Sequence, residues 1–164
     1  AREFWIYNNS FQGGLAGRSY QQGQQLFAAA ACFKCHRFAG QGGIVGPDLT
    51  AAARRFNNKD LLDSMTLPSR TVSDQYQAST FVLANGKTIV GRVANLSGEN
   101  IMVITNMLEP GKLTAVRRSE IDEVVPSKTS MMPEGLLDTL SKEEILDLIA
   151  YIRAGGDPGH AAFK

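Results

Sequence analysis

The sequence predicts a mainly α-helical fold that is interrupted by a small antiparallel β-sheet or barrel. Apolar residues recur at helical spacing near both ends of the chain, whereas they alternate with polar residues between about residues 75 and 125. The 164 residues, of which 43% are hydrophobic and 20% charged, suffice for one or two compact units. This composition is typical of a folded chain rather than a disordered one.

Start and stop signals place three helices. A first helix is expected from about residue 18 to residue 31, and a second from about residue 58 to Met65, where a Leu-Pro pair stops it. The last helix has the clearest signals. Ser141 and Glu144 form a capping box, apolar residues follow at helical spacing, and Gly155-Gly156 ends the helix.

Between the second and last helices, alternating β-branched runs predict four or five antiparallel strands. Asn85-Gly86 separates two such runs and favours a type I′ hairpin. The helical segments that remain have a length comfortable for one small domain. The predicted division is an N-terminal arm at residues 1–17, a helical domain at 18–74 and 126–154, an inserted sheet at 75–125 and a C-terminal tail at 155–164.

The two cysteines of the chain are Cys32 and Cys35, and His36, one of only two histidines, follows directly. Thiols at this spacing lie on one side of a helical turn and can form thioethers with the two vinyl groups of a haem. The histidine that follows can bind the iron through Nε2. The motif therefore predicts one covalently attached haem c, held by Cys32 and Cys35, with His36 as the proximal iron ligand.

Three alternatives compete for this motif. A thioredoxin-like dithiol is expected beside a βαβ pattern, whereas an alanine-rich helix precedes the motif here. A structural zinc site needs four ligands, and outside the motif only His160 remains. A disulfide bond across so short a loop would stabilise the chain little. Covalent haem is the favoured interpretation.

Together, the runs Gly23-x-x-x-Phe27, Cys32-x-x-Cys35-His36 and Gly46-Pro47-Asp48-Leu49 resemble class I cytochrome c. In that family the glycine and the aromatic residue of the first helix pack against the last helix. The resemblance implies that the Pro47 carbonyl accepts a hydrogen bond from Nδ1 of His36. Such a bond would orient the ring and make it a better donor to iron.

The resemblance also implies a methionine as the second iron ligand, in a loop directly before a proline and ahead of the final helix. Met132-Pro133 matches that pattern. Met131 is the alternative, because a shift of one residue would exchange the two. Met102, in an alternating apolar run, is most simply a strand residue, and Met65 a core residue.

A wider resemblance covers about residues 18–154. The stretch from Pro68 to Tyr76, the sheet that follows and the stretch from Met132 to Leu137 are similar to the haem-binding domains of planctomycete and verrucomicrobial proteins. Such domains often lie at the C-terminal end of larger oxidoreductases. The resemblance therefore implies either a separate electron carrier or the electron-accepting module of a larger oxidoreductase.

Iron held by both His36 and Met132 has no open position, so the expected function is one-electron transfer at a positive reduction potential, without catalysis. If Met132 does not bind iron, a five-coordinate haem c for ligand sensing or peroxidase-like chemistry is the alternative. A role mainly as an interaction module is not separable from these by sequence. Candidate partners of the haem propionates are Arg54, Arg55 and Arg70, which are otherwise solvated surface charges.

Charge and hydropathy limit the partners. A net charge of +1 offers no footprint for nucleic acid, and no apolar run is long enough for a membrane span. Residues 1–72 carry eight basic and four acidic side chains. A basic surface there would steer an acidic redox partner, and a merely uneven distribution of charge explains the same pattern equally well. The inserted sheet is expected to be a docking surface, with dimerisation or a cover over the haem as alternatives.

The expected compartment is the periplasm or another space outside the cytoplasm, because bacteria attach haem c there. On this expectation, Ala1 follows a removed leader or a domain boundary.

Overall fold

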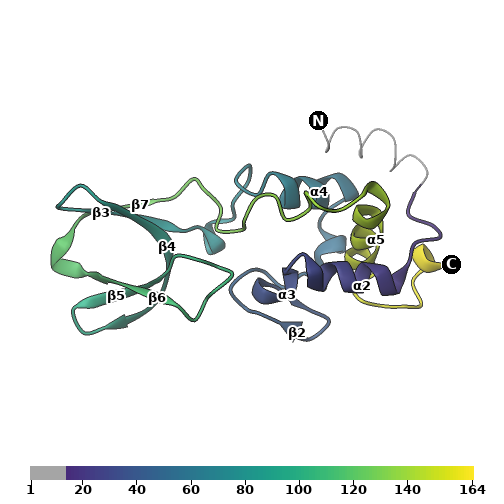
Figure 1. Cartoon of the computed structure of the whole chain (residues 1–164), viewed down its shortest axis with the longest axis horizontal. Helices are drawn as coiled ribbons and strands as arrows, with labels where there is room; N and C mark the ends of the chain where they lie inside the picture. The colour runs from purple at the N-terminus through teal and green to yellow at the C-terminus, as the bar shows by residue number, and fades with distance from the viewer. Residues whose placement is uncertain (1–13) are drawn as a thin grey trace. The chain divides into compact units, whose positions relative to one another are not determined.

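The computed structural model describes residues 14–164, so the predicted N-terminal arm at residues 1–17 lies mostly outside the described residues. The chain forms two compact units (Figure 1). The first comprises the described residues up to Leu67 together with Glu134–Lys164, and the second is Pro68–Pro133. The first unit is helical and the second holds an antiparallel sheet, which confirms the predicted fold class.

The first unit is built on α2 (Tyr20–Ala29), α4 (Asn58–Thr66) and α5 (Lys142–Arg153). These are the three expected helices, with ends within two residues of those predicted for the first two. The shorter elements are α3 (Cys32–Cys35), β1 (Arg37–Phe38), β2 (Gln41–Gly42) and the 3₁₀ helices η2 (Ala52–Arg54) and η5 (Ala161–Phe163). None of the helices in the described part of the chain is long and apolar enough to cross a membrane.

Helices α2 and α5 pack closely where Gly23 meets Asp147 and Tyr151. A Cβ atom on Gly23 would lie 2.5 Å from the Asp147 carbonyl oxygen and 2.6 Å from Tyr151 Cβ, so only glycine fits. One turn later, the fully buried Phe27 lies with its ring centroid 5.8 Å from that of Tyr151. This is the helix contact that the class I cytochrome c resemblance implied.

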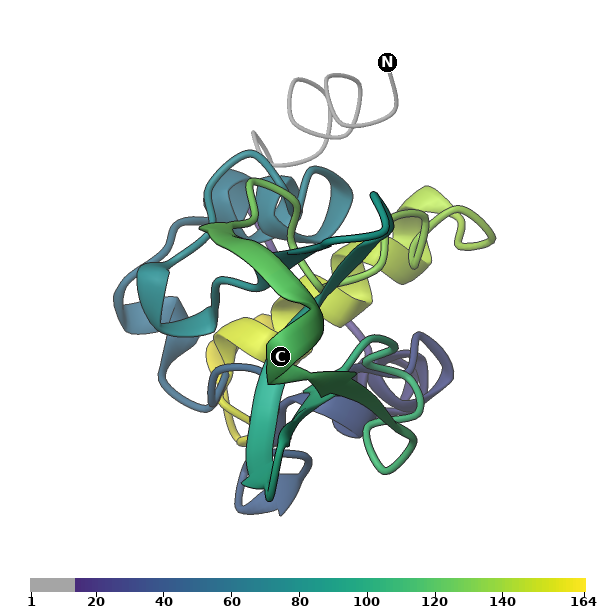
Figure 2. The same cartoon turned by 90° about the vertical axis from the view of Figure 1, so that its left-hand side faces the viewer.

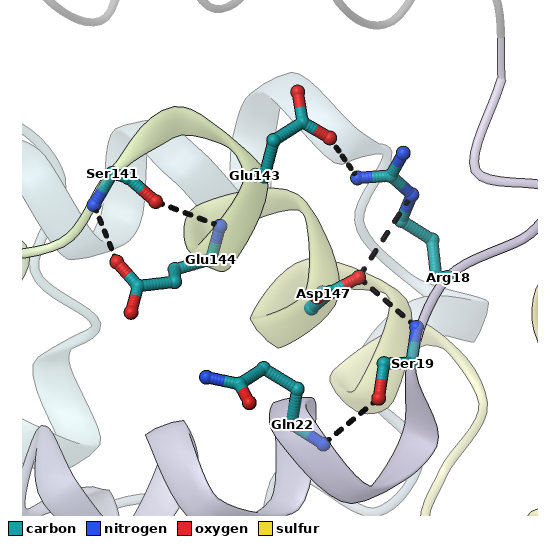
Figure 3. A network of polar contacts seen from close by, with 7 residues as sticks. All are labelled: Arg18, Ser19, Gln22, Ser141, Glu143, Glu144 and Asp147. Atoms are coloured by element: carbon teal, nitrogen blue, oxygen red, sulfur yellow. Dashed lines mark hydrogen bonds and ion pairs between the residues drawn. The ribbon is translucent and has the colours of Figure 1, made fainter.

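Polar contacts join the starts of the same two helices (Figure 3). The Arg18 guanidinium donates to Glu143 at 2.7 Å, and the backbone N–H of Ser19 donates to the Asp147 carboxylate at 3.0 Å. Because the first N–H groups of a helix have no partner within it, the Asp147 carboxylate also favours the N-terminal end of α2. The α2–α5 contact is therefore apolar at its centre and ionic at its rim.

The second unit is a strongly curved sheet of five antiparallel strands in the order β6-β5-β4-β3-β7 (Figure 2). Phe81, Leu83, Val103 and Val116 form its core. The strands are β3 (Ser79–Leu83), β4 (Thr88–Ser97), β5 (Asn100–Ile104), β6 (Leu113–Arg117) and β7 (Ile121–Pro126), with 3₁₀ helices η3 (Asp74–Tyr76) and η4 (Arg118–Glu120). The predicted four or five antiparallel strands are thus present.

The expected type I′ hairpin at Asn85-Gly86 is wrong. A type I′ turn requires a positive φ at both residues, but Ala31 and Ala39 are the only non-glycine residues with positive φ in residues 14–164. Instead, the Gly86 N–H closes a turn onto the Leu83 carbonyl at 2.8 Å, and Gly86 alone is left-handed, with φ +81°. The loop is one residue longer than predicted, and glycine is needed only at its end.

Candidate functional site

Cys32 and Cys35 are the first and last residues of α3, a single helical turn that follows α2. Neither thiol is in a disulfide bond, and both residues are partly exposed. Ala31, directly before the turn, has a left-handed backbone with φ +61°, which redirects the chain from α2 into α3. The two thiols therefore lie one helical turn apart, as the motif predicts.

Burial raises the pKa of the Cys32 thiol to about 12, with a backbone hydrogen bond acting against it and the nearby Cys35 adding to it. Burial also raises the pKa of Cys35, which the charge of Lys34 partly opposes. Both thiols are protonated at neutral pH, whereas metal binding and disulfide exchange require thiolates. Within residues 14–164, no cluster of three or more His, Cys, Asp or Glu could hold a metal ion.

His36 directs its ring nitrogen Nδ1 to the Pro47 carbonyl oxygen, 2.7 Å away. This is the hydrogen bond that the resemblance implied. Because a carbonyl can only accept, Nδ1 carries the proton and the lone pair of the neutral ring lies on Nε2. Burial lowers the pKa of His36, while the bond to Pro47 opposes the shift, so the ring is neutral at neutral pH. His36 thus presents Nε2 as a ligand.

Gly46 provides the surface on which the His36 ring lies. A Cβ atom at Gly46 would lie 2.8 Å from Cε1 of the ring and 2.9 Å from Nδ1. Its N–H donates to the Cys35 carbonyl at 2.7 Å. Gly46 belongs to the Gly46-Pro47-Asp48-Leu49 run, but the run alone predicts no role for it. Its position directly before Pro47 is the signal from which that role could be found.

Three aromatic rings fix the motif against the helices. Phe33, within α3, packs edge-on against Phe27 with centroids 4.5 Å apart, and Phe38 lies 4.9 Å from Phe27 on another side. Both Phe27 and Phe38 are fully buried. Phe33 and Phe38 were missed by the sequence reasoning, because no local pattern shows that their rings meet Phe27.

Met131 and Met132, the two candidate iron ligands, lie in the second unit. Met131 and Met132 are both partly exposed, and the Met132 N–H donates to the Ser130 hydroxyl at 3.1 Å. Met65 is buried in α4 and Met102 lies on β5, as expected.

The remaining candidates have separate surroundings. Arg54 and Arg55 are exposed in the first unit, where Arg55 lies over the Phe56 ring at 5.5 Å, and Arg70 is exposed in the second unit. His160, the other histidine, caps the start of η5, where its Nδ1 accepts the Ala162 N–H at 3.2 Å. His160 therefore has a structural role at the C-terminal end of the described chain.

These residues fit a covalently attached haem. Two protonated thiols lie one turn apart, the next residue offers an imidazole lone pair on Nε2, and a glycine leaves room for its ring. In sequence comparisons, the family model described as Cytochrome c matches residues 20–90, and no curated protein matches the chain. The chain thus contains a cytochrome c family domain over residues 20–90. Cys32, Cys35 and His36 fit its CxxCH motif, consistent with one covalently bound haem c.

Proposed function

We propose that the chain carries single electrons through one haem c, attached by Cys32 and Cys35, whose iron is bound by Nε2 of His36. The observation that supports this most is the 2.7 Å contact between His36 Nδ1 and the Pro47 carbonyl. It places the proton of the neutral ring on Nδ1 and orients the ring. When bound, the haem would supply a one-electron couple. The chain already orients Nε2 of His36 through the bond to Pro47, so little rearrangement would accompany electron transfer.

We further propose Met132 as the second iron ligand. Met132 directly precedes Pro133, and the chain returns to the first unit at Glu134. A thioether is a soft, weak donor that favours ferrous iron, so His/Met ligation gives a positive reduction potential. With His36 and Met132 both holding the iron, no position would stay open to a substrate, which favours a carrier or an electron-accepting module over a catalyst. Met131 remains the alternative ligand.

The proposed partner is an acidic redox protein. Between residues 20 and 59, which include the attachment motif, the chain carries five basic residues and one acidic residue, Asp48. Basic charge on this part of the first unit would steer an acidic partner, and high salt would weaken the encounter. We propose that the first unit is the haem domain, that the second is a docking surface, and that the protein acts outside the cytoplasm.

Visible absorption spectra of the oxidised and reduced protein test the ligands. We expect sharp c-type bands on reduction, and a weak far-red band in the oxidised protein that reports sulfur bound to ferric iron. Met132→Ala should abolish the far-red band, and Met131→Ala, the matched control, should preserve it. The reverse pattern would assign the ligand to Met131.

Carbon monoxide separates electron transfer from the five-coordinate alternative. We expect the reduced protein to resist carbon monoxide and the Met132→Ala variant to bind it rapidly. Rapid binding by the unaltered protein, together with no far-red band, would replace the carrier function with ligand sensing or peroxidase-like chemistry. A protein purified without covalent haem would contradict the whole proposal.

A further inference from the structure

Two segments of the first unit run side by side around His36. Residues 43–50 lie alongside residues 33–39 and are hydrogen-bonded to them. The contact between His36 and Pro47 lies between these two paired segments. The backbone hydrogen bonds of the pairing run from Gly43 N to Phe33 O (2.8 Å), from Gly46 N to Cys35 O (2.7 Å) and from Leu49 N to Arg37 O (2.9 Å). The Pro47 carbonyl is therefore held by bonds on both sides of it.

Thr50 closes the far end of this pairing with its side chain. Its hydroxyl donates to Asp48 Oδ1 at 2.6 Å and accepts the N–H of Ala39 at 3.0 Å. Because a hydroxyl has a single hydrogen, the bond to Asp48 directs the oxygen lone pairs of Thr50 toward Ala39. Asp48 Oδ1 also accepts the backbone N–H of Thr50 at 2.8 Å. The hydrogen bonds from Thr50 lower the pKa of Asp48, so this carboxylate is charged at neutral pH.

The backbone that Thr50 holds is in an uncommon conformation. Ala39 has φ +49° and Gly40 has φ +81°, so the turn between β1 and β2 places two consecutive residues in the left-handed region. For alanine this conformation is unfavourable, because its Cβ lies too close to the following carbonyl oxygen. A specific acceptor for the Ala39 N–H offsets part of that cost and fixes the segment that follows His36.

We propose that Thr50 and Asp48 are positioning residues that keep the Pro47 carbonyl on Nδ1 of His36 and thereby set how strongly Nε2 donates to iron. A firm hydrogen bond from Nδ1 makes the imidazole a stronger donor, which stabilises ferric iron and lowers the reduction potential. Loosening the bond raises the potential. The inference rests on the proposed coordination of iron by His36.

Thr50→Val removes the hydroxyl at nearly constant shape, and Thr50→Ser is the matched control that keeps it. The reduced holoprotein is examined by NMR for solvent exchange of the His36 Nδ1 proton and of the Ala39 amide, and its reduction potential is measured. We expect Thr50→Val to speed exchange at both sites and to raise the potential. Thr50→Ser should restore all three values to those of the unaltered protein.

Faster exchange at the Ala39 amide alone, with an unchanged His36 proton and potential, would overturn the proposal and leave Thr50 a local structural role. If Thr50→Val yields no folded holoprotein, Asp48→Ala is the second variant, because it removes the acceptor of the Thr50 hydroxyl. Only the exchange of the His36 Nδ1 proton is compared in this variant, since loss of the Asp48 charge shifts the reduction potential by itself. Unchanged exchange of the His36 Nδ1 proton in Asp48→Ala would also overturn the proposal. An NMR spectrum of the oxidised, unaltered protein in which the iron does not shift the His36 ring signals would instead contradict the proposed function.

Discussion

His36 is positioned by the backbone of two neighbouring residues, Gly46 and Pro47. Its ring lies over Gly46, and the neighbouring residue supplies the carbonyl that orients Nδ1. The position of the proposed iron-binding nitrogen is therefore set by backbone atoms, which move less than side chains do. This explains how two short motifs, with nine residues between them, act as one site.

At this scale we predict that Gly46→Ala displaces the His36 ring. The added Cβ would lie 2.8 to 3.2 Å from three ring atoms, too close for the ring to stay in place. Forcing an extra methyl into a packed site costs about 1 to 3 kcal/mol of unfolding free energy. Chemical denaturation and the oxidised spectrum measure the loss of stability and the changed ligation.

Gly111→Ala is the matched control for this change, because a Cβ at Gly111 meets nothing within 4 Å and its φ is not positive. An unchanged spectrum and stability in Gly46→Ala would show that the ring is not confined as the structure indicates.

Among the elements, α5 begins with a complete capping box. The Ser141 hydroxyl accepts the Glu144 N–H, and the Glu144 carboxylate accepts the Ser141 N–H at 2.7 Å (Figure 3). Hydrogen bonding to the carboxylate by the Ser141 backbone N–H, and to a lesser extent by the Ser141 side chain, lowers the pKa of Glu144. The lowered pKa means that the charged form of Glu144 stabilises the folded state.

We therefore predict that Glu144→Gln destabilises the protein at neutral pH but not in acid. A carboxyl with a depressed folded pKa contributes stability above its unfolded pKa, and that contribution is lost as the pH falls through the folded pKa. Unfolding free energies of both proteins, measured from about pH 7 to about pH 3, should converge in acid. The exposed Glu123→Gln removes the same charge without a helix cap and serves as control. A difference that persists in acid would contradict this account.

Local sequence signals were sufficient for the elements but not for all their connections. The capping box at Ser141 and the CxxCH spacing act within one helical turn, so short motifs predict them. The turn at Asn85 was mispredicted because the pair Asn-Gly suits two loop lengths, and strand pairing selects between them. Likewise, the contact between the Phe27 and Phe33 rings and the bond from the Ala39 N–H to the Thr50 hydroxyl depend on how the chain turns between the partners, which no short motif specifies.

For the molecule as a whole, we predict that damage to the sheet core leaves haem attachment intact. Val103 is fully buried in the second unit, whereas the attachment motif belongs to the first. Val103→Ala should lower the unfolding free energy of the sheet by about 2 kcal/mol, through lost burial and the cavity left behind. Circular dichroism follows the sheet, and mass spectrometry of the denatured protein follows the covalent haem.

Val93→Ala removes the same atoms from a side chain that is 50% exposed, and should cost much less stability. Loss of covalent haem in Val103→Ala would show that the two units do not form separately.

The packing of Phe27 against Tyr151 also sets an order of events during synthesis. The sheet contains all of its strands within residues 79–126, so it is complete before α5 has been made. The first unit must wait, because α2 cannot bury its apolar face until α5 follows, and contacts so distant in sequence form slowly. Until α5 docks, the segment that carries the two thiols follows a helix without its main packing partner, which favours joining the haem before the core of the first unit closes.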